Sequence, residues 1–152
     1  MITPRVTVMV PARATDADVL AEIHAASFPE PWTANDFAVF LMQPGIAGWI
    51  SGARTPKGFI LVRRVVEEAE VLTLAVDPAQ RRQGLARRLL DYAMEELRQR
   101  GIISCFLEVA IDNTAARGLY GSAGFTEVST RRGYYQNADG TRADAIVMRR
   151  DL

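Results

Sequence analysis

The sequence has very little of several residue types on which common protein architectures depend. Of its 152 residues, one is a cysteine (Cys105), one a histidine (His24) and one a lysine (Lys57). A single cysteine excludes an internal disulfide, and one cysteine with one histidine excludes the usual zinc clusters, so no metal is expected. No apolar run approaches the roughly 20 residues that span a bilayer, and residues 1–10 lack the pattern of a signal peptide. These absences indicate a cytoplasmic protein that makes no contact with a membrane.

The charge of the chain is balanced, and its length is that of one domain. Eighteen Lys and Arg residues offset eighteen Asp and Glu residues, so the formal net charge is zero. General nucleic-acid binding needs a basic surface, and we therefore expect no direct contact with nucleic acid. With 49% hydrophobic residues and no repeat or linker, the chain is expected to form one soluble, monomeric domain over residues 1–152.

Hydrophobic periodicity predicts alternating strands and helices. Strands are predicted at 5–10, 47–52, 58–66, 71–76, 102–111, 125–132 and 143–149, and helices at 15–28, 33–41, 84–100 and 113–122. The acidic residues at 67–70 are interpreted as a solvated connection between two strands. The nearly unbroken apolar run at 102–111 predicts a strand covered on both faces. The order is typical of an α/β fold in which a mixed sheet carries helices on both faces.

The most informative stretch is a turn crowded with arginine, Arg81-Arg82-Gln83-Gly84-Leu85-Ala86-Arg87-Arg88. It opens a predicted helix, where the helix dipole disfavours each cation by about 0.3–1 kcal/mol. Gly84 allows the backbone to approach a ligand closely, and the amides of the first helical turn have no partners within the helix. A bound polyanion accounts for both features. A solvated basic turn is the alternative.

Several motifs in this order resemble the GNAT family of acetyltransferases. Arg81-x-x-Gly84-x-Ala86 is similar to that family's acetyl-CoA pyrophosphate loop, and residues 72–78 are similar to its fourth strand. Further segments that carry the resemblance are 28–32, 106–109, 113–120, 124–125, 131–135 and 144–145. Within the family, these motifs are most similar to RimI-type enzymes, which acetylate the N-terminal alanine of a small-subunit ribosomal protein.

The resemblance implies a fold, a co-substrate and a set of site residues. The fold is the GNAT fold, a mixed and mostly antiparallel sheet of about six to seven strands, splayed at strands 4 and 5. The co-substrate is acetyl-CoA, and the partner is the N-terminus of a ribosomal or other cytosolic protein. The residues implied to contact acetyl-CoA are Leu74, Ala75, Val76, Arg81, Arg82, Gln83, Gly84, Leu85, Ala86, Arg87 and Asn113. Amides near 74–76 are the expected oxyanion donors, and Trp32, Tyr134 and Tyr135 are implied to flank the peptide entrance.

Glu108 is the only charged residue between Ile102 and Ile111. Burying a carboxylate in an apolar strand is costly, and two reasons can justify it, general-base chemistry or an ion pair with an arginine. Spacing alone does not separate them; the resemblance favours the base. An α-amino group titrates near about 7.7–8.0 and glutamate near about 4.3, so direct proton transfer is uphill by roughly 5 kcal/mol. A raised pKa or a water relay would be needed.

Other residues have a simple packing interpretation beside a functional one. Tyr120 at an apolar helical position is expected in the core, whereas the resemblance implies that it protonates the departing CoA thiolate. Asn113 is expected to cap its helix. His24 is interpreted as a packing or surface residue and Cys105 as a core residue. Ala110 stands where the family commonly has arginine, which is expected to alter substrate preference.

Three functions compete at this point. The first is a protein N-terminal acetyltransferase, which Trp32, Tyr134 and Tyr135 favour. The second is a family member that acetylates a small-molecule amine or another protein amine. The third is a CoA-binding module without catalysis, which the presence of both Glu108 and Tyr120 disfavours. No Gly-Lys-Ser/Thr or Gly-x-Gly-x-x-Gly motif supports a nucleotide-binding loop.

Overall fold

A computed structural model describes residues 8–52, 55–81, 83–136 and 139–152, with no side-chain description at 135 and 136. The strands are β1 (Met9–Pro11), β2 (Ile46–Ser51), β3 (Gly58–Val65), β4 (Glu68–Val76), β5 (Ser104–Ala110), β6 (Thr126–Gln136) and β7 (Arg142–Asp151). The helices are α1 (Ala17–Ala25), α2 (Ala34–Leu41), α3 (Leu85–Gln99) and α4 (Thr114–Ser122), with 3-10 turns at Ala14–Asp16 and Pro78–Gln80. None of the described helices is long and apolar enough to cross a membrane.

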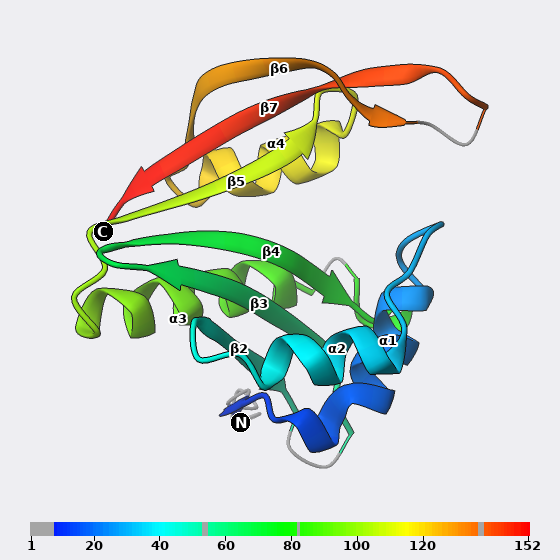
Figure 1. Cartoon of the computed structure of the whole chain (residues 1–152), viewed down its shortest axis with the longest axis vertical. Helices are drawn as coiled ribbons and strands as arrows, with labels where there is room; N and C mark the ends of the chain where they lie inside the picture. The colour runs from blue at the N-terminus through cyan, green and yellow to red at the C-terminus, as the bar shows by residue number, and fades with distance from the viewer. Residues whose placement is uncertain (1–7, 53–54, 82, 137–138) are drawn as a thin grey trace, which may run out of the picture.

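The strands form a mixed sheet in the order β1-β2-β3-β4-β5-β7-β6 (Figure 1). Every neighbouring pair in it is antiparallel except β4 and β5, which are parallel. The crossover from β4 to β5 runs through α3, as a parallel connection requires. The predicted fold class is confirmed, with seven strands in the described part of the chain.

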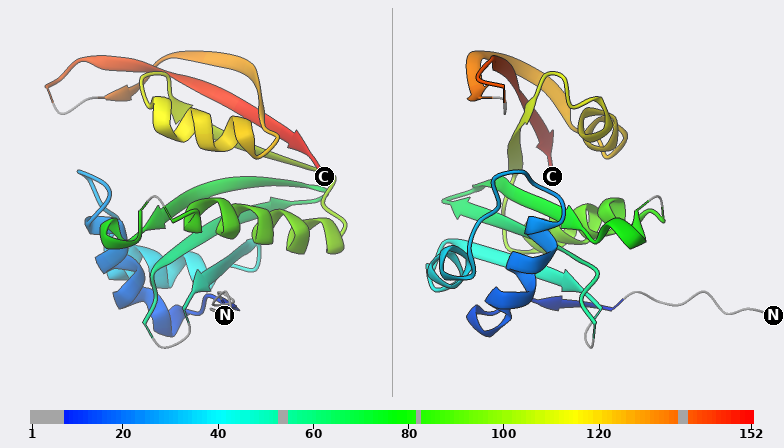
Figure 2. Two further views of the ribbon diagram at one scale, coloured as in Figure 1. Left: turned by 180° about the vertical axis from the view of Figure 1, so that it is seen from behind. Right: turned by 90° about the vertical axis from the view of Figure 1, so that its right-hand side faces the viewer.

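The central pair of strands separates soon after it forms. β4 and β5 pair only through Glu68↔Ser104, Ala69↔Cys105 and Glu70↔Phe106, and beyond these positions the two strands diverge (Figures 1 and 2). β4 also contains a bulge, because Leu61 pairs with Thr73 whereas the next residue of β3, Val62, pairs with Val71. The bulge adds local bend and twist at the point where the strands part. The predicted splay is therefore confirmed.

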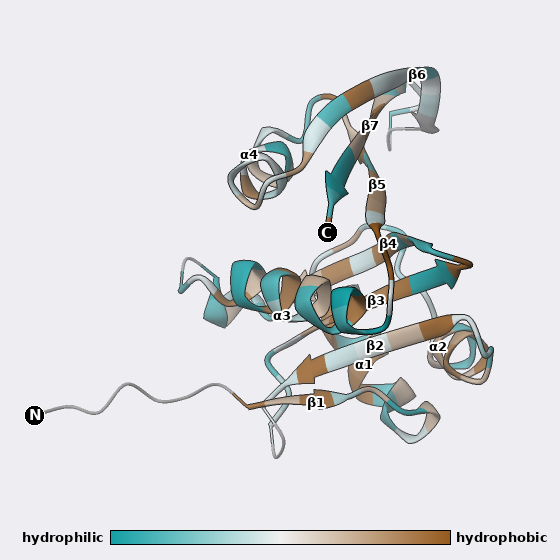
Figure 3. Ribbon diagram, turned by 90° about the vertical axis from the view of Figure 1, so that its left-hand side faces the viewer, coloured by the Kyte–Doolittle hydropathy of each residue, from teal (hydrophilic) through white to brown (hydrophobic). Residues whose placement is uncertain are grey.

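Helices cover the two faces of the sheet unequally. α3 and α4 lie on one face, and α1 and α2 on the other (Figure 3). The apolar side of α3 is buried against the sheet through Leu85, Leu89, Leu90, Ala93, Met94 and Leu97. A second cluster packs α1 and α2 on β2, β3 and β4, with Leu20, Phe37 and Phe59 fully buried. On the α1–α2 face, β5, β6 and β7 have no helix over them (Figure 3).

This unequal cover corrects one prediction. β5 was expected to be buried on both faces, but burial alternates along it, with Leu107 and Val109 buried and Glu108 and Ala110 only partly so. The residues on the uncovered face are apolar enough to hide the alternation in the sequence, with Glu108 as the exception. Cys105 lies in the buried row, as predicted, and burial raises its pKa to about 12.

Several predicted boundaries are also wrong, including the end of β6, which continues to Gln136 past its predicted end at 132. α1 begins at Ala17 after a 3-10 turn in which Arg13 N–H donates to Asp16 Oδ2 at 2.8 Å, so Thr15 does not cap the helix. β4 begins at Glu68, which places two of the acidic residues in a strand and not in the connection. Glu70 pairs across the sheet with Arg63, and opposite charges at such positions stabilise a sheet. The prediction that these acidic residues are solvated is confirmed, since Glu68 and Glu70 are exposed.

Candidate active site

The divergence of β4 and β5 leaves a cavity of about 260 Å³ between them. Its lining residues come from β4, β5, α4 with its N-cap and the α1–α2 connection: Phe28, Val71, Leu72, Thr73, Leu74, Leu107, Glu108, Val109, Ala110, Asn113, Ala116 and Tyr120. The structure thus brings together the predicted base Glu108 and the predicted acid Tyr120, from two different elements. Asn113 also lies here, and its Oδ1 accepts the Ala116 N–H at 3.2 Å, which confirms its expected role as the cap of α4.

Two further cavities continue from this one toward the arginine-rich turn. The first, of about 210 Å³, shares Leu74, Ala116 and Tyr120 with the site cavity and adds Ser27, Ala75, Val76, Arg81, Ala86 and Leu119. The second, of about 400 Å³, shares Val76, Arg81, Ala86 and Leu119 and reaches Gln80, Gly84, Leu85, Arg87 and Ala115. Nearly all of the residues predicted to contact acetyl-CoA line this series of cavities. Gln83 lies beside it in the turn, and Arg82 lies outside the described residues.

The turn at the far end has the geometry expected of an anion site. Gly84 adopts the left-handed conformation (φ +74°) and immediately precedes α3, so glycine is favoured there. The first amides of an α-helix have no acceptor within the helix and point outward along its axis. Some of the arginine side chains are engaged in the fold: Arg81 Nη2 donates to Ser27 Oγ at 3.3 Å and Arg88 Nη1 to the Gln83 carbonyl at 2.8 Å.

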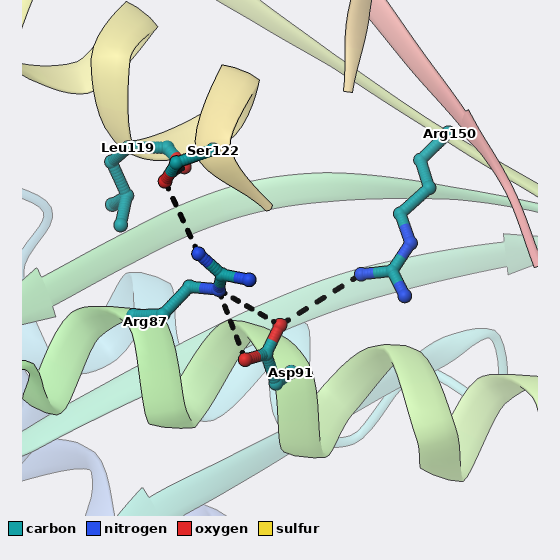
Figure 4. A network of polar contacts seen from close by, with 5 residues as sticks. All are labelled: Arg87, Asp91, Leu119, Ser122 and Arg150. Atoms are coloured by element: carbon teal, nitrogen blue, oxygen red, sulfur yellow. Dashed lines mark hydrogen bonds and ion pairs between the residues drawn. The ribbon is translucent and has the colours of Figure 1, made fainter. Parts of the chain in front are cut away.

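A polar network ties α3 to the strands on the other side of the splay (Figure 4). Arg87 contacts Asp91 at 3.0 Å and donates from Nη1 to Ser122 Oγ of α4 at 3.2 Å. Asp91 also lies 3.8 Å from Arg150 of β7. These groups are partly exposed, so each contact contributes little alone. Together they connect α3 to α4 and to β7 on the other half of the sheet.

The Glu108 side chain is 21% exposed and lies next to an arginine. Arg131 Nη1 of β6 donates to Glu108 Oε1 at 2.6 Å, and this contact raises the pKa of Arg131. The Arg131 guanidinium also stacks on the ring of Tyr134, 4.0 Å from its centroid. The structure therefore confirms that Glu108 forms an ion pair with an arginine. It does not exclude base chemistry, since the same side chain lines the site cavity and a second one, of about 280 Å³, on the uncovered face.

Tyr120 combines packing with access to the cavities. Its ring packs edge-on against Phe125 with centroids 5.9 Å apart, and it contacts the main core while lining two cavities. It is half-buried and packs against the core, so its predicted core position is confirmed only in part. Its role as an acid stays a prediction.

The α1–α2 connection is held by His24, which is 3% exposed. The Trp32 N–H donates to His24 Nδ1 at 3.0 Å, and the imidazole stacks on Phe28 (4.3 Å) and Trp32 (5.2 Å). The packing interpretation of His24 is confirmed. These contacts hold Phe28 at the wall of the site cavity. Trp32 is half-buried and packs on Phe37 and Phe40, next to the connection.

The other two residues predicted at the peptide entrance lie on β6. Tyr134 is 49% exposed beneath Arg131. Tyr135 pairs with Ala143 through the backbone, and its side chain is outside the described part of the structure. The Gly133 N–H donates to Asp144 Oδ1 at 2.8 Å, within the irregular stretch of β6 where its register with β7 shifts between Arg131 and Tyr135.

The environment of His24 leads to a prediction about stability and pH. Burial lowers the pKa of His24, so the unfolded chain binds a proton below about pH 6.5 that the folded chain does not. The contribution of His24 to stability is therefore complete above about pH 6.5 and is lost as the pH falls below it. We expect the melting temperature to fall more between pH 7 and 5.5 in the wild type than in His24→Asn. Equal pH dependence in the two proteins, measured by calorimetry, would contradict this.

Sequence reasoning did not identify several residues of the site. Phe28, Thr73 and Arg131 come next to Glu108 only through tertiary structure, since Arg131 is 23 positions away in the sequence. The residue pattern of β6 does not reveal how this strand is aligned with β7 and β5, so the sequence did not indicate that Arg131 contacts Glu108. Within the described residues, no group of three or more His, Cys, Asp or Glu side chains could hold a metal ion.

The splayed sheet, the glycine turn before α3 and the cavities between them define an acyltransferase architecture, and the comparisons with known proteins agree. The chain belongs to the acetyltransferase (GNAT) family, whose family model matches residues 17–125. It is an N-acetyltransferase of that family, similar over most of its length to RimI-type enzymes.

Two relatives and two solved structures illustrate the similarity. The [ribosomal protein bS18]-alanine N-acetyltransferase of Escherichia coli K12 is 37% identical over 134 residues, covering 88% of this chain and 90% of that protein. The N-alpha-acetyltransferase RimI of Mycobacterium tuberculosis is 39% identical over 144 residues, covering 90% and 87%. The crystal structure of the E. coli ribosomal-protein-S18-alanine N-acetyltransferase superposes with a TM-score of 0.90 at 33% identity, covering 97% and 94%. Arabidopsis thaliana NAA60 in complex with acetyl-CoA shares the fold alone, with a TM-score of 0.83 at 19% identity, covering 97% and 99%.

Proposed function

We propose that the protein transfers the acetyl group of acetyl-CoA to the N-terminal α-amino group of a protein, namely the N-terminal alanine of a small-subunit ribosomal protein. The observation that carries this proposal is the shared cavity of Glu108 and Tyr120, at one end of a series of cavities that begins at Gly84. The names of the E. coli and M. tuberculosis relatives support the α-amino group as the acceptor, and the E. coli name supports ribosomal protein bS18.

The chain offers acetyl-CoA sites that suit its pyrophosphate, its pantetheine arm and its thioester. The amides that follow Gly84 suit the pyrophosphate, because they combine free donors with the positive end of a helix dipole. The cavity of about 210 Å³, lined largely by apolar residues such as Leu74, Val76 and Leu119, suits the pantetheine arm. When bound, acetyl-CoA supplies the activated thioester. Amides of residues 74–76, beyond the region in which β4 pairs with β5, are proposed to donate to the developing oxyanion.

The two ionisable side chains divide the proton transfers. Glu108 takes a proton from the α-ammonium group, which frees the nitrogen lone pair for attack on the thioester carbonyl. Tyr120 gives its proton to the sulfur as the carbon–sulfur bond breaks. Arg131 competes with the substrate ammonium for the Glu108 carboxylate, because the ion pair already occupies Oε1. The substrate amine enters between the α1–α2 connection, which carries Phe28, and β6, which carries Tyr134.

A thermal-shift experiment tests the acetyl-CoA site. A ligand that binds only the folded state at 100 times its Kd stabilises that state by about 2.7 kcal/mol, so acetyl-CoA is expected to raise the melting temperature of the wild type. Gly84→Asp is expected to abolish the shift, because it places a carboxylate among the amides proposed to hold the pyrophosphate. Gly84→Asn is the matched control: asparagine has the same shape as aspartate without its charge and tolerates φ +74°, and this variant should keep part of the shift. A normal shift in Gly84→Asp would remove this assignment.

A substrate panel tests the acceptor. Peptides that begin with Ala-Arg, peptides with other first residues and a set of small-molecule amines are incubated with the protein and acetyl-CoA, and the products are measured by mass spectrometry. We expect the Ala-Arg peptides to be acetylated fastest. Faster acetylation of the small amines would refute the peptide substrate and favour a small-molecule acetyltransferase.

A further inference from the structure

The hydroxyl of Thr73 is buried in the site without a hydrogen bond. Thr73 is 7% exposed, and its Oγ1 has no partner among the described residues. Two other side chains share this property, Ser51 at Oγ and Arg64 at Nε. Thr73 differs from both because it lines the cavity that holds Glu108 and Tyr120. Buried polar groups in proteins are almost always hydrogen-bonded, so such a group in a reaction site needs an explanation.

The β4 bulge places Thr73 on the same face of the sheet as Glu108. Thr73 pairs with Leu61 and lies two residues before Ala75, and Leu61 and Ala75 both belong to the core under α1 and α2. Glu108 reaches this face by an independent route. Its neighbours Leu107 and Val109 belong to the core under α3, so the Glu108 side chain points the other way.

The bulge is what gives Thr73 this position. Before it, the residues of β4 that face α3 are Ala69 and Val71; after it, they are Leu74 and Val76. If the same sequence formed a regular strand without the bulge, the side chain at position 73 would continue the row of Ala69 and Val71 and enter the apolar α3 core. The same irregularity that helps to part the strands therefore turns a hydroxyl toward the side from which the substrate amine approaches.

We propose that Thr73 is a positioning residue of the acetyl transfer, whose hydroxyl holds a water molecule between the substrate amine and Glu108. This role rests on the proposed function. The cavity, at about 260 Å³, has room for a water, which occupies about 30 Å³. The site also provides it with polar partners, which are the Thr73 hydroxyl, the Glu108 carboxylate and the entering ammonium.

Each hydrogen in this arrangement has a defined destination. The water accepts an N–H of the α-ammonium, donates one hydrogen to a Glu108 carboxylate oxygen and donates the other to Thr73 Oγ1. As the ammonium proton passes to the water oxygen, the water's own proton passes to Glu108, which becomes neutral. The water is regenerated, and the amine is left with its lone pair. Thr73 gains the hydrogen bond that it lacks in the protein alone and exchanges no proton.

The test compares Thr73→Val, which keeps the shape and removes the hydroxyl, with Thr73→Ser, which keeps the hydroxyl and removes a methyl group. We expect Thr73→Val to lower kcat on the Ala-Arg peptide by about tenfold or more near pH 7, within the range of general acid–base effects. Its defect should shrink as the pH rises and the amine becomes neutral unaided. Thr73→Ser should stay within about threefold of the wild type, since the hydrogen bond is retained.

Two controls distinguish this role from a structural one. Because the hydroxyl has no bond to lose, Thr73→Val should melt no lower than the wild type and should keep the acetyl-CoA shift. In a Glu108→Gln background, Thr73→Val should cause little further loss, because two members of one relay are not additive. Provided that the wild type is active, any of three results would overturn the proposal. These are full activity of Thr73→Val, equal losses in Thr73→Val and Thr73→Ser, and effects of Thr73→Val and Glu108→Gln that add. A wild type that acetylates no α-amine would instead overturn the proposed function, and this role with it.

Discussion

Replacing Glu108 with glutamine is expected to slow acetylation of an Ala-Arg peptide by at least about tenfold near neutral pH, because general-base catalysis typically contributes about 10²–10⁴-fold. The substitution keeps the size of a side chain that lines two cavities and is only 21% exposed. The defect should shrink as the pH rises through about 7.7–8.0, where the α-amine becomes neutral without help. Initial rates from pH 6.5 to 9.5 at saturating acetyl-CoA measure this.

The control for Glu108→Gln is its response to acetyl-CoA. Glu108 does not line the cavities near Gly84, so the variant should show the melting shift of the wild type. The substitution also removes the charge that Arg131 contacts. Because Arg131 is exposed, little stability should be lost. Near-normal turnover at every pH would show that Glu108 serves only as the partner of Arg131.

Replacing Tyr120 with phenylalanine is expected to cause a loss of similar size that persists at high pH. A thiol titrates at about 8.5 and tyrosine at about 10, so proton transfer from Tyr120 to a free thiolate is uphill by about 2 kcal/mol and is expected to be concerted with cleavage of the carbon–sulfur bond. Raising the pH does not supply this proton. Phenylalanine keeps the ring that packs on Phe125, so the melting temperature should change little. Turnover equal to that of the wild type would leave Tyr120 as a core residue alone.

The two variants together separate the base from the acid. Recovery at high pH is expected for Glu108→Gln and not for Tyr120→Phe. The reverse result would require the two roles to be exchanged. Unchanged turnover in both variants across the pH range would remove the acid–base assignment, although the fold and the family would stand.

Local signals in the sequence predicted those parts of the fold that depend on local physics. Thr33 and Asp36 form a reciprocal cap at the start of α2, and such a cap is visible in the sequence. Gly101 ends α3 with φ +87°, the left-handed conformation in which glycine is favoured. The apolar stripe of α3 follows the helical period and is buried as that period requires. Each of these features depends on residues within one or two turns of each other.

The arrangement of the site depends on distant residues, which periodicity does not reveal. The Arg131–Glu108 ion pair follows from the register in which β7 joins β6 to β5. The β4 bulge moves the Thr73 side chain to the opposite face of the sheet from the one it would occupy in a regular strand. An apolar strand sequence gives no sign of such a bulge. β5 is partly exposed because α1 and α2 pack on β2, β3 and β4 and do not extend over β5. For these reasons the sequence could suggest Glu108 and Tyr120 as candidates, whereas it could not reveal Arg131 or Thr73 as their neighbours.

The most direct test of the proposed function is the position of the acetyl group on a peptide that carries both an N-terminal alanine and an internal lysine. After limited reaction with acetyl-CoA, fragmentation by mass spectrometry locates the modification. An α-amino group is easier to deprotonate than a lysine side chain at neutral pH by about 3.5 kcal/mol, and we expect acetylation at the α-amino group to dominate in the wild type. Acetylation of the lysine in excess of the α-amino group would contradict the account.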